Sequence, residues 1–162
     1  MQHKRPFKVV IADDKVTSIA TDPEGKEHLK VCSDGSAQDS KVGSAVVLIC
    51  PGKETRKLHS HLGSVNHHMV FEAKLVGLLL GLYLIKMEKL RTSYTLVADN
   101  IAVLTAVKTP GNKSGHYLAD TFIKTACSLH KARCTPNYSL MMRWTAGVLG
   151  MTMSALTRAM SI

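Results

Sequence analysis

A long apolar segment in the middle of the chain constrains the fold more than any other feature. Residues 69–90 have helical periodicity, and apolar side chains cover more than half of the predicted helix surface. Gly77 and Gly81 lie four residues apart on one side, which in a globular domain favours close packing of the helix on a sheet. The segment therefore predicts a largely buried helix, with apolar residues Val70, Phe71, Leu75, Leu78, Leu79, Leu82, Ile85 and Met87.

Shorter patterns on both sides of this helix predict the sheet. Before it come three strand-like runs, and after it come a strand, a short helix, a second helix, a strand and a final helix. This β-β-β-α-β-α-α-β-α order predicts one α/β domain with a mixed sheet over residues 28–162, preceded by a lead-in segment of residues 1–27. The expected strands are 28–33, 43–50, 56–63, 94–98 and 138–144, and the further helices are 100–108, 115–132 and 151–160.

The charge of the chain indicates a polyanionic partner. The 162 residues include 21 Lys and Arg against 12 Asp and Glu, a formal net charge of +9. This surplus suits nucleic acid first and an anionic membrane surface second, while a basic protein with no such partner is the alternative. The longest apolar stretch, 75–85, is too short to span a bilayer, so we expect no membrane insertion. Without a secretory signal or paired cysteines, we expect a cytoplasmic or nuclear protein.

Three acidic residues lie in apolar surroundings: Asp34, Glu72 and Asp99. An unpaired carboxylate is costly to bury, so their recurrence at element ends suggests that they converge on a metal ion. We expect Asp34 on the first strand of the sheet, Glu72 in the first turn of the long helix and Asp99 at the end of the strand 94–98. Carboxylate ligands favour Mg²⁺ or Mn²⁺. An Asp beside Gly is also an ordinary turn former.

Short motifs around these acids resemble ribonuclease H. They are Ser-Asp-Gly-Ser-Ala at 33–37, the runs 42–48 and 71–81, and Ala-Asp-Asn at 98–100. The sequence is most similar to the ribonuclease H domains of fungal retrotransposon reverse transcriptases, over about residues 28–160. The lead-in looks like the segment that joins such a domain to the polymerase, which leaves open two alternatives: a chain that works alone and a parent polyprotein.

The resemblance implies a ribonuclease H-like fold, with a five-stranded mixed sheet flanked by helices on both faces. It also implies hydrolysis of the RNA strand of an RNA/DNA hybrid, with two divalent ions at the scissile phosphate. Asp34, Glu72 and Asp99 would be the catalytic residues and metal ligands. Asp34 would bridge both ions, and Glu72 and Asp99 would complete the leaving-group site.

The fourth carboxylate of the family is missing. By resemblance its position holds Arg158, and no Asp or Glu follows Asp120. A guanidinium repels a divalent ion by several kcal/mol at about 4 Å and intermediate dielectric, and it does not deprotonate. Two interpretations remain: a weakened hydrolase that binds hybrid with one ion or none, or an inactive nucleic-acid-binding or protein-assembly module.

Further residues are candidates for contact with nucleic acid. Lys86, Lys89 and Arg91 at the end of the long helix would track a phosphate backbone, or else form a solvated helix end. Ser36 and Asn100 lie beside the predicted site, although Asn100 also suits a helix N-cap.

Overall fold

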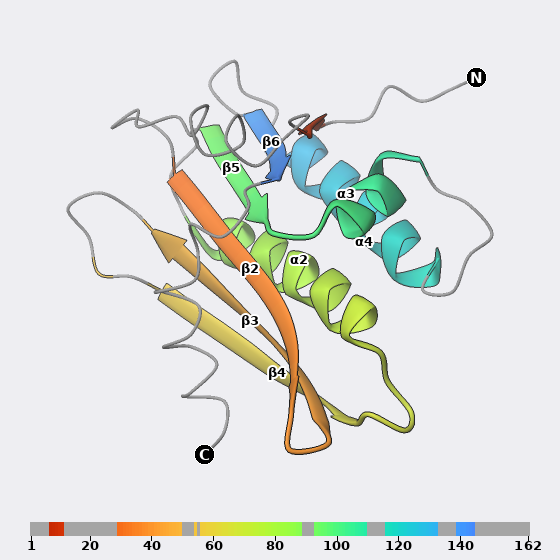
Figure 1. The fold of residues 1–162 in the computed structure, drawn as a ribbon. Helices are drawn as coiled ribbons and strands as arrows, with labels where there is room; N and C mark the ends of the chain where they lie inside the picture. Colours follow the sequence, from red (N-terminus) through yellow and green to blue (C-terminus); the bar gives the residue numbers. More distant parts are fainter. Residues whose placement is uncertain are drawn as a thin grey trace.

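Six strands form one mixed sheet in the computed structural model, which describes residues 7–11, 29–49, 54, 56–88, 93–109, 116–132 and 139–144 (Figure 1). The strand order across the sheet is β1-β6-β5-β2-β3-β4. The predicted α/β class with a mixed sheet is confirmed. The strands are β1 (Lys8–Val10), β2 (Leu29–Gln38), β3 (Lys41–Ile49), β4 (Arg56–Ser64), β5 (Ser93–Ala98) and β6 (Ser139–Trp144).

One half of the sheet is antiparallel and the other half is parallel. β2, β3 and β4 form a meander of antiparallel neighbours, whereas β2, β5, β6 and β1 run parallel. Gln38 pairs with Lys41, so β2 and β3 are joined by the two residues Asp39 and Ser40, which have φ angles of 52° and 62°. Left-handed backbone at both positions matches the twist of the strands. The connection is therefore shorter than the expected strand bounds 28–33 and 43–50 imply, and β2 continues past Asp34.

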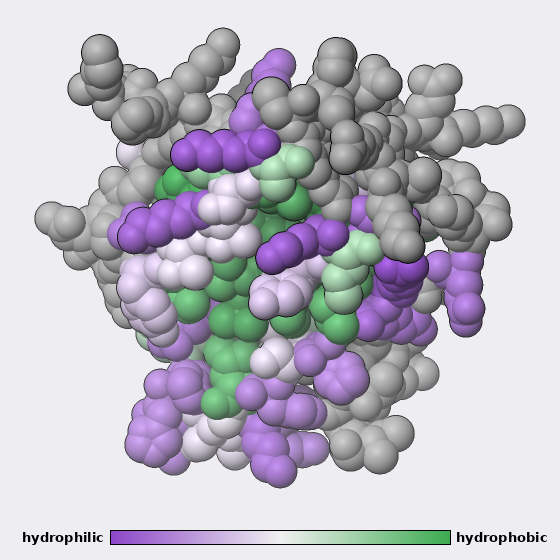
Figure 2. Space-filling model, turned by 180° about the vertical axis from the view of Figure 1, so that it is seen from behind, coloured by the Kyte–Doolittle hydropathy of each residue, from purple (hydrophilic) through white to green (hydrophobic). Residues whose placement is uncertain are grey.

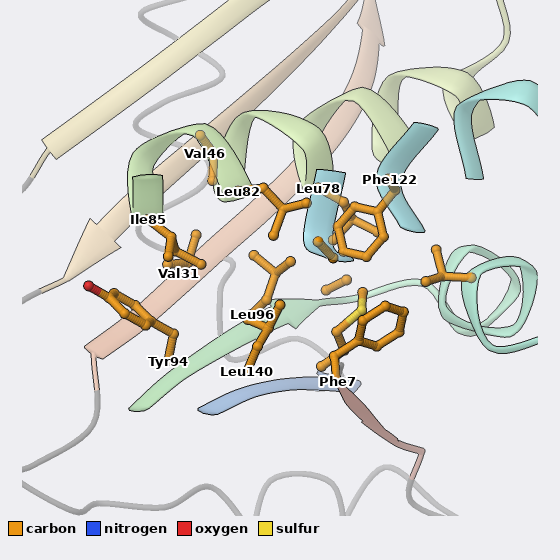
Figure 3. Packing of buried hydrophobic residues seen from close by; sticks show 14 of the residues in the cluster. Phe7, Val31, Val46, Leu78, Leu82, Ile85, Tyr94, Leu96, Phe122 and Leu140 are labelled. Carbon is orange, nitrogen blue, oxygen red and sulfur yellow. The ribbon is translucent and has the colours of Figure 1, made fainter. Parts of the chain in front are cut away.

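The three helices of the described chain are α2 (Val70–Met87), α3 (Ile101–Lys108) and α4 (His116–Ala132). α2 packs on β2 and β3, and both α3 and α4 contact α2. Figure 3 shows the resulting core, in which helix residues such as Leu82 and Phe122 meet sheet residues such as Val31 and Leu96. The helix predicted over 69–90 is thus confirmed as a buried helix on the sheet.

The opposite sheet face buries a smaller apolar cluster of Cys32, Ala45, Val47 and Val97. The helix predicted over 151–160, on which the expectation of helices on both faces depends, lies outside the described residues. In the described part of the chain, no helix is both long enough and apolar enough to cross a membrane.

The sheet has one more strand than expected. β1, which comes from the lead-in, pairs in parallel with β6 at the sheet edge. Just before β1, Phe7 is buried against Phe122 of α4, with ring centroids 5.7 Å apart in an edge-to-face arrangement. A run of three residues is too short for its alternation to predict pairing with the sheet. At least residues 7–10 of the lead-in therefore pack with the domain.

Candidate functional site

Asp34 and Asp99 lie side by side because of the parallel pairing of β2 and β5. The last residues that pair these two strands are Ser33 and Ala98; Asp34 is the next residue of β2, and Asp99 directly follows the end of β5. Side chains at matched positions of parallel neighbours project from the same face of the sheet. The structure thus brings together two of the three acidic residues that were expected to converge.

A lysine joins the two aspartates. Lys74 Nζ donates to Asp34 Oδ1 at 2.8 Å and to Asp99 Oδ1 at 2.9 Å. Asp34 Oδ1 also accepts the backbone N–H of Gly35 at 2.8 Å. Side-chain exposure is 16% for Lys74, 22% for Asp34 and 39% for Asp99. The ammonium group thus lies between the two carboxylates in a largely enclosed position.

The environment keeps Lys74 charged. Burial alone would lower the pKa of Lys74, but the hydrogen bonds and charges of Asp34 and Asp99 outweigh this effect and raise the pKa above its usual value. Lys74 is therefore a cation at neutral pH.

Close packing of α2 on β2 brings Lys74 to this position. A Cβ added to Gly35 would lie 2.5 Å from Lys74 N and 2.6 Å from Ala73 C, so the helix backbone rests directly on the strand. One turn later, a Cβ on Gly77 would lie 3.2 Å from Asp34 O. The absence of side chains at these positions lets the first turns of α2 approach the strand segment that carries Asp34.

Glu72 has a different neighbour. Its Oε2 lies 3.4 Å from His68 Nδ1, one helical turn earlier. At about 100° per residue, Glu72 lies about 180° around α2 from Gly81, whereas Lys74 lies within about 20° of Gly81. The structure therefore places Lys74, and not Glu72, beside the two aspartates. The catalytic and metal-binding roles of Asp34, Glu72 and Asp99 stay predictions.

Lys74 is not among the predicted site residues, because acids in apolar surroundings were the signal that indicated the site. The signal that identifies it is its spacing from the glycines. Lys74 lies three residues before Gly77 and seven before Gly81, which puts it on the side of the helix that meets the sheet. A charged residue on that side must have a partner of opposite charge.

Comparison with known proteins identifies the fold. No protein-family model matches the chain, and no curated protein matches its sequence. Solved structures do match. A ribonuclease H1 isolated from compost by metagenomics has a TM-score of 0.60 at 15% identity, covering 80% of this chain and 92% of the other. The chain has a ribonuclease H-like fold.

Two further structures share this ribonuclease H-like fold. The N-terminal ribonuclease H domain of a Mycobacterium tuberculosis protein has a TM-score of 0.55 at 14% identity, covering 76% of this chain and 91% of the other. The compost ribonuclease H1 was also solved in complex with an RNA/DNA hybrid. That structure has a TM-score of 0.52 at 15% identity and covers 72% of this chain and 85% of the other.

As the structure arranges them, the residues around Asp34 and Asp99 do not fit the divalent ions that the resemblance implies. Lys74 Nζ already contacts Oδ1 of both Asp34 and Asp99, so an ion bound to these oxygens must displace the ammonium. Among the described residues, no three His, Cys, Asp or Glu side chains are grouped so as to hold a metal ion.

The other candidate residues have separate positions on the fold. Ser36 is half-buried on β2, two residues after Asp34. Asn100 caps α3, because its Oδ1 accepts the backbone N–H of Val103 at 3.1 Å, which confirms the N-cap interpretation. Lys86 is exposed in the last turn of α2. Lys89, Arg91 and Arg158 lie outside the described residues.

Proposed function

We propose that the chain binds RNA/DNA hybrid as a ribonuclease H-type domain. The observation that carries this proposal is the adjacent pair Asp34 and Asp99 on a ribonuclease H-like fold. A protein of this fold has been solved with an RNA/DNA hybrid bound. The formal net charge of +9 supports a polyanionic ligand. An origin in a retroelement, a parent polyprotein and a cytoplasmic or nuclear location belong to the same proposal.

We further propose that hydrolysis of the RNA strand is weak or absent. Hydrolysis of this type requires Mg²⁺ or Mn²⁺ to stabilise the attacking and leaving oxygens. Two cationic side chains oppose this: Lys74 between the aspartates, and Arg158 at the position that resembles the fourth carboxylate. One ion or none is therefore expected in the wild-type protein.

A protein-assembly role is the second candidate, and exposed apolar residues favour it. Tyr83 and Met87 of α2 are 59% and 49% exposed, and Met69 just before α2 is also exposed. Figure 2 shows a continuous apolar band bordered by hydrophilic side chains on the face seen from behind. Contiguous apolar surface of this kind is typical of protein contacts.

Affinity for a labelled RNA/DNA hybrid is expected to fall steeply with salt. Each phosphate neutralised by a basic side chain contributes a slope of about −0.9 to the plot of log affinity against log salt concentration. Lys86→Gln is expected to reduce the slope by about one unit, because it removes one of the proposed phosphate contacts. Fluorescence anisotropy at several salt concentrations measures the hybrid affinity and its dependence on salt.

The matched control is Lys124→Gln, which removes the same charge from an exposed position on α4, one turn after Asp120. It is expected to leave the slope unchanged. Absence of hybrid binding at low salt would contradict the proposal and favour the assembly role. Any cleavage of the same hybrid in Mg²⁺ should be lost in Asp34→Asn, and cleavage that survives this change would refute the site.

A further inference from the structure

The contact of Lys74 with Asp34 and Asp99 has the form of a cation bound by two carboxylates. Lysine has three N–H donors and no acceptor, and two of the donors are used by the two Oδ1 atoms. The group comes from a helix and the two acceptors come from neighbouring strands, so three separate elements converge on it. Lys74 is only 16% exposed and Asp34 22%, so the ammonium is largely enclosed, while Asp99, at 39%, also reaches solvent.

The pair of aspartates needs a positive charge at this place. Their strands hold them at adjacent positions, so their negative charges repel each other unless a cation lies between them. A bound divalent ion would meet this need, and so does the Lys74 ammonium. The two cations exclude one another, because they would use the same oxygen atoms and carry charge of the same sign.

We propose that Lys74 is the internal cation of the Asp34–Asp99 site and closes it to divalent ions. The side chain at position 74 then decides whether the site holds a metal. This inference deepens the proposed function, since it concerns how the site of the hybrid-binding domain is regulated. It also means that the ordered arrangement of Asp34 and Asp99 does not depend on metal.

Lys74→Glu should convert the site into a metal-binding one. The substitution puts a third carboxylate on α2 next to the other two, and it replaces the ammonium by a side chain one bond shorter. The space left suits an ion, since oxygen ligands lie only about 2.0–2.1 Å from Mg²⁺. Three carboxylates from three elements are ligands typical of Mg²⁺ and Mn²⁺.

The test is Mn²⁺ binding to the full chain, measured by electron paramagnetic resonance and by isothermal titration calorimetry. Lys74→Glu is expected to bind one Mn²⁺ at least tenfold more tightly than the wild type, roughly the effect of 1.4 kcal/mol. Lys74→Met removes the charge without adding a ligand, so its Mn²⁺ affinity should lie between those of the wild type and Lys74→Glu. Lys124→Glu makes the same charge change on exposed α4 and should bind Mn²⁺ as the wild type does.

Two results would overturn the inference. One is equal Mn²⁺ affinity in the wild type and Lys74→Glu when circular dichroism shows that both are folded. The other is tight Mn²⁺ binding by the wild type that is lost in Asp34→Asn, a result that does not require any Lys74 variant to fold. Hybrid affinity is measured separately. A failed Mn²⁺ test with intact hybrid binding refutes the role of Lys74 alone, whereas absent hybrid binding refutes the proposed function.

Discussion

Phe122→Ala is expected to lower the free energy of unfolding by about 3–5 kcal/mol, the usual cost of removing a buried phenyl ring. Phe122 is fully buried in the core between α4 and the sheet, where its ring meets that of Phe7 (Figure 3). This loss of stability has two causes: the apolar surface of the ring is no longer buried, and a cavity remains in the core. Urea denaturation followed by circular dichroism measures the change.

Tyr117→Ala is the matched control for Phe122→Ala, because Tyr117 is an aromatic residue of the same helix that is 65% exposed. Its effect should be within about 0.5 kcal/mol. A double-mutant cycle with Phe7→Ala should give a coupling of about 0.5–1.5 kcal/mol for the ring pair. If the cycle shows no coupling, the lead-in does not pack on the domain as the structure has it.

Gly35→Ala is the second change with a large expected effect, a destabilisation of about 1–3 kcal/mol from overpacking. The added Cβ would meet Lys74 N at 2.5 Å, Ala73 C at 2.6 Å and Ala73 Cβ at 2.8 Å. Two of these atoms belong to the helix backbone, so α2 must move away from β2. That movement also withdraws Lys74 from Asp34.

Gly77→Ala is the matched comparison for Gly35→Ala on the facing helix. The nearest atom to its added Cβ is Asp34 O at 3.2 Å, and replacing a helix glycine with alanine gains up to about 1 kcal/mol in helix propensity. Its net effect should therefore be much smaller than that of Gly35→Ala. Equal effects of the two substitutions would show that α2 does not rest on Gly35.

Much of the fold was predictable because the hydrophobic periodicity is strong. The apolar positions of α2 and the strand runs on both sides of it are enough to place a buried helix on a mixed sheet. Asn100 was likewise recognised as an N-cap, since Asn before an apolar helical run has a local signature. These features depend on short-range patterns, which the sequence displays directly.

The site was predictable only in part. The meeting of Asp34 and Asp99 follows from strand order, but β2 reaches past Asp34 because of a turn at Asp39 and Ser40 that composition does not specify. The third partner depends on which side of α2 faces the sheet. That side carries Lys74, whereas Glu72 was expected at the site from its acidic type, its place in the first helical turn and the resemblance.

The most direct measurement of the central claim is hybrid affinity in EDTA and in Mg²⁺ at the same ionic strength, by fluorescence anisotropy with the wild-type chain. If Lys74 supplies the cation between Asp34 and Asp99, the site is formed without metal. We predict that the hybrid binds with the same affinity, within about twofold, in both buffers. Binding that is absent in EDTA and restored by Mg²⁺ would contradict this claim.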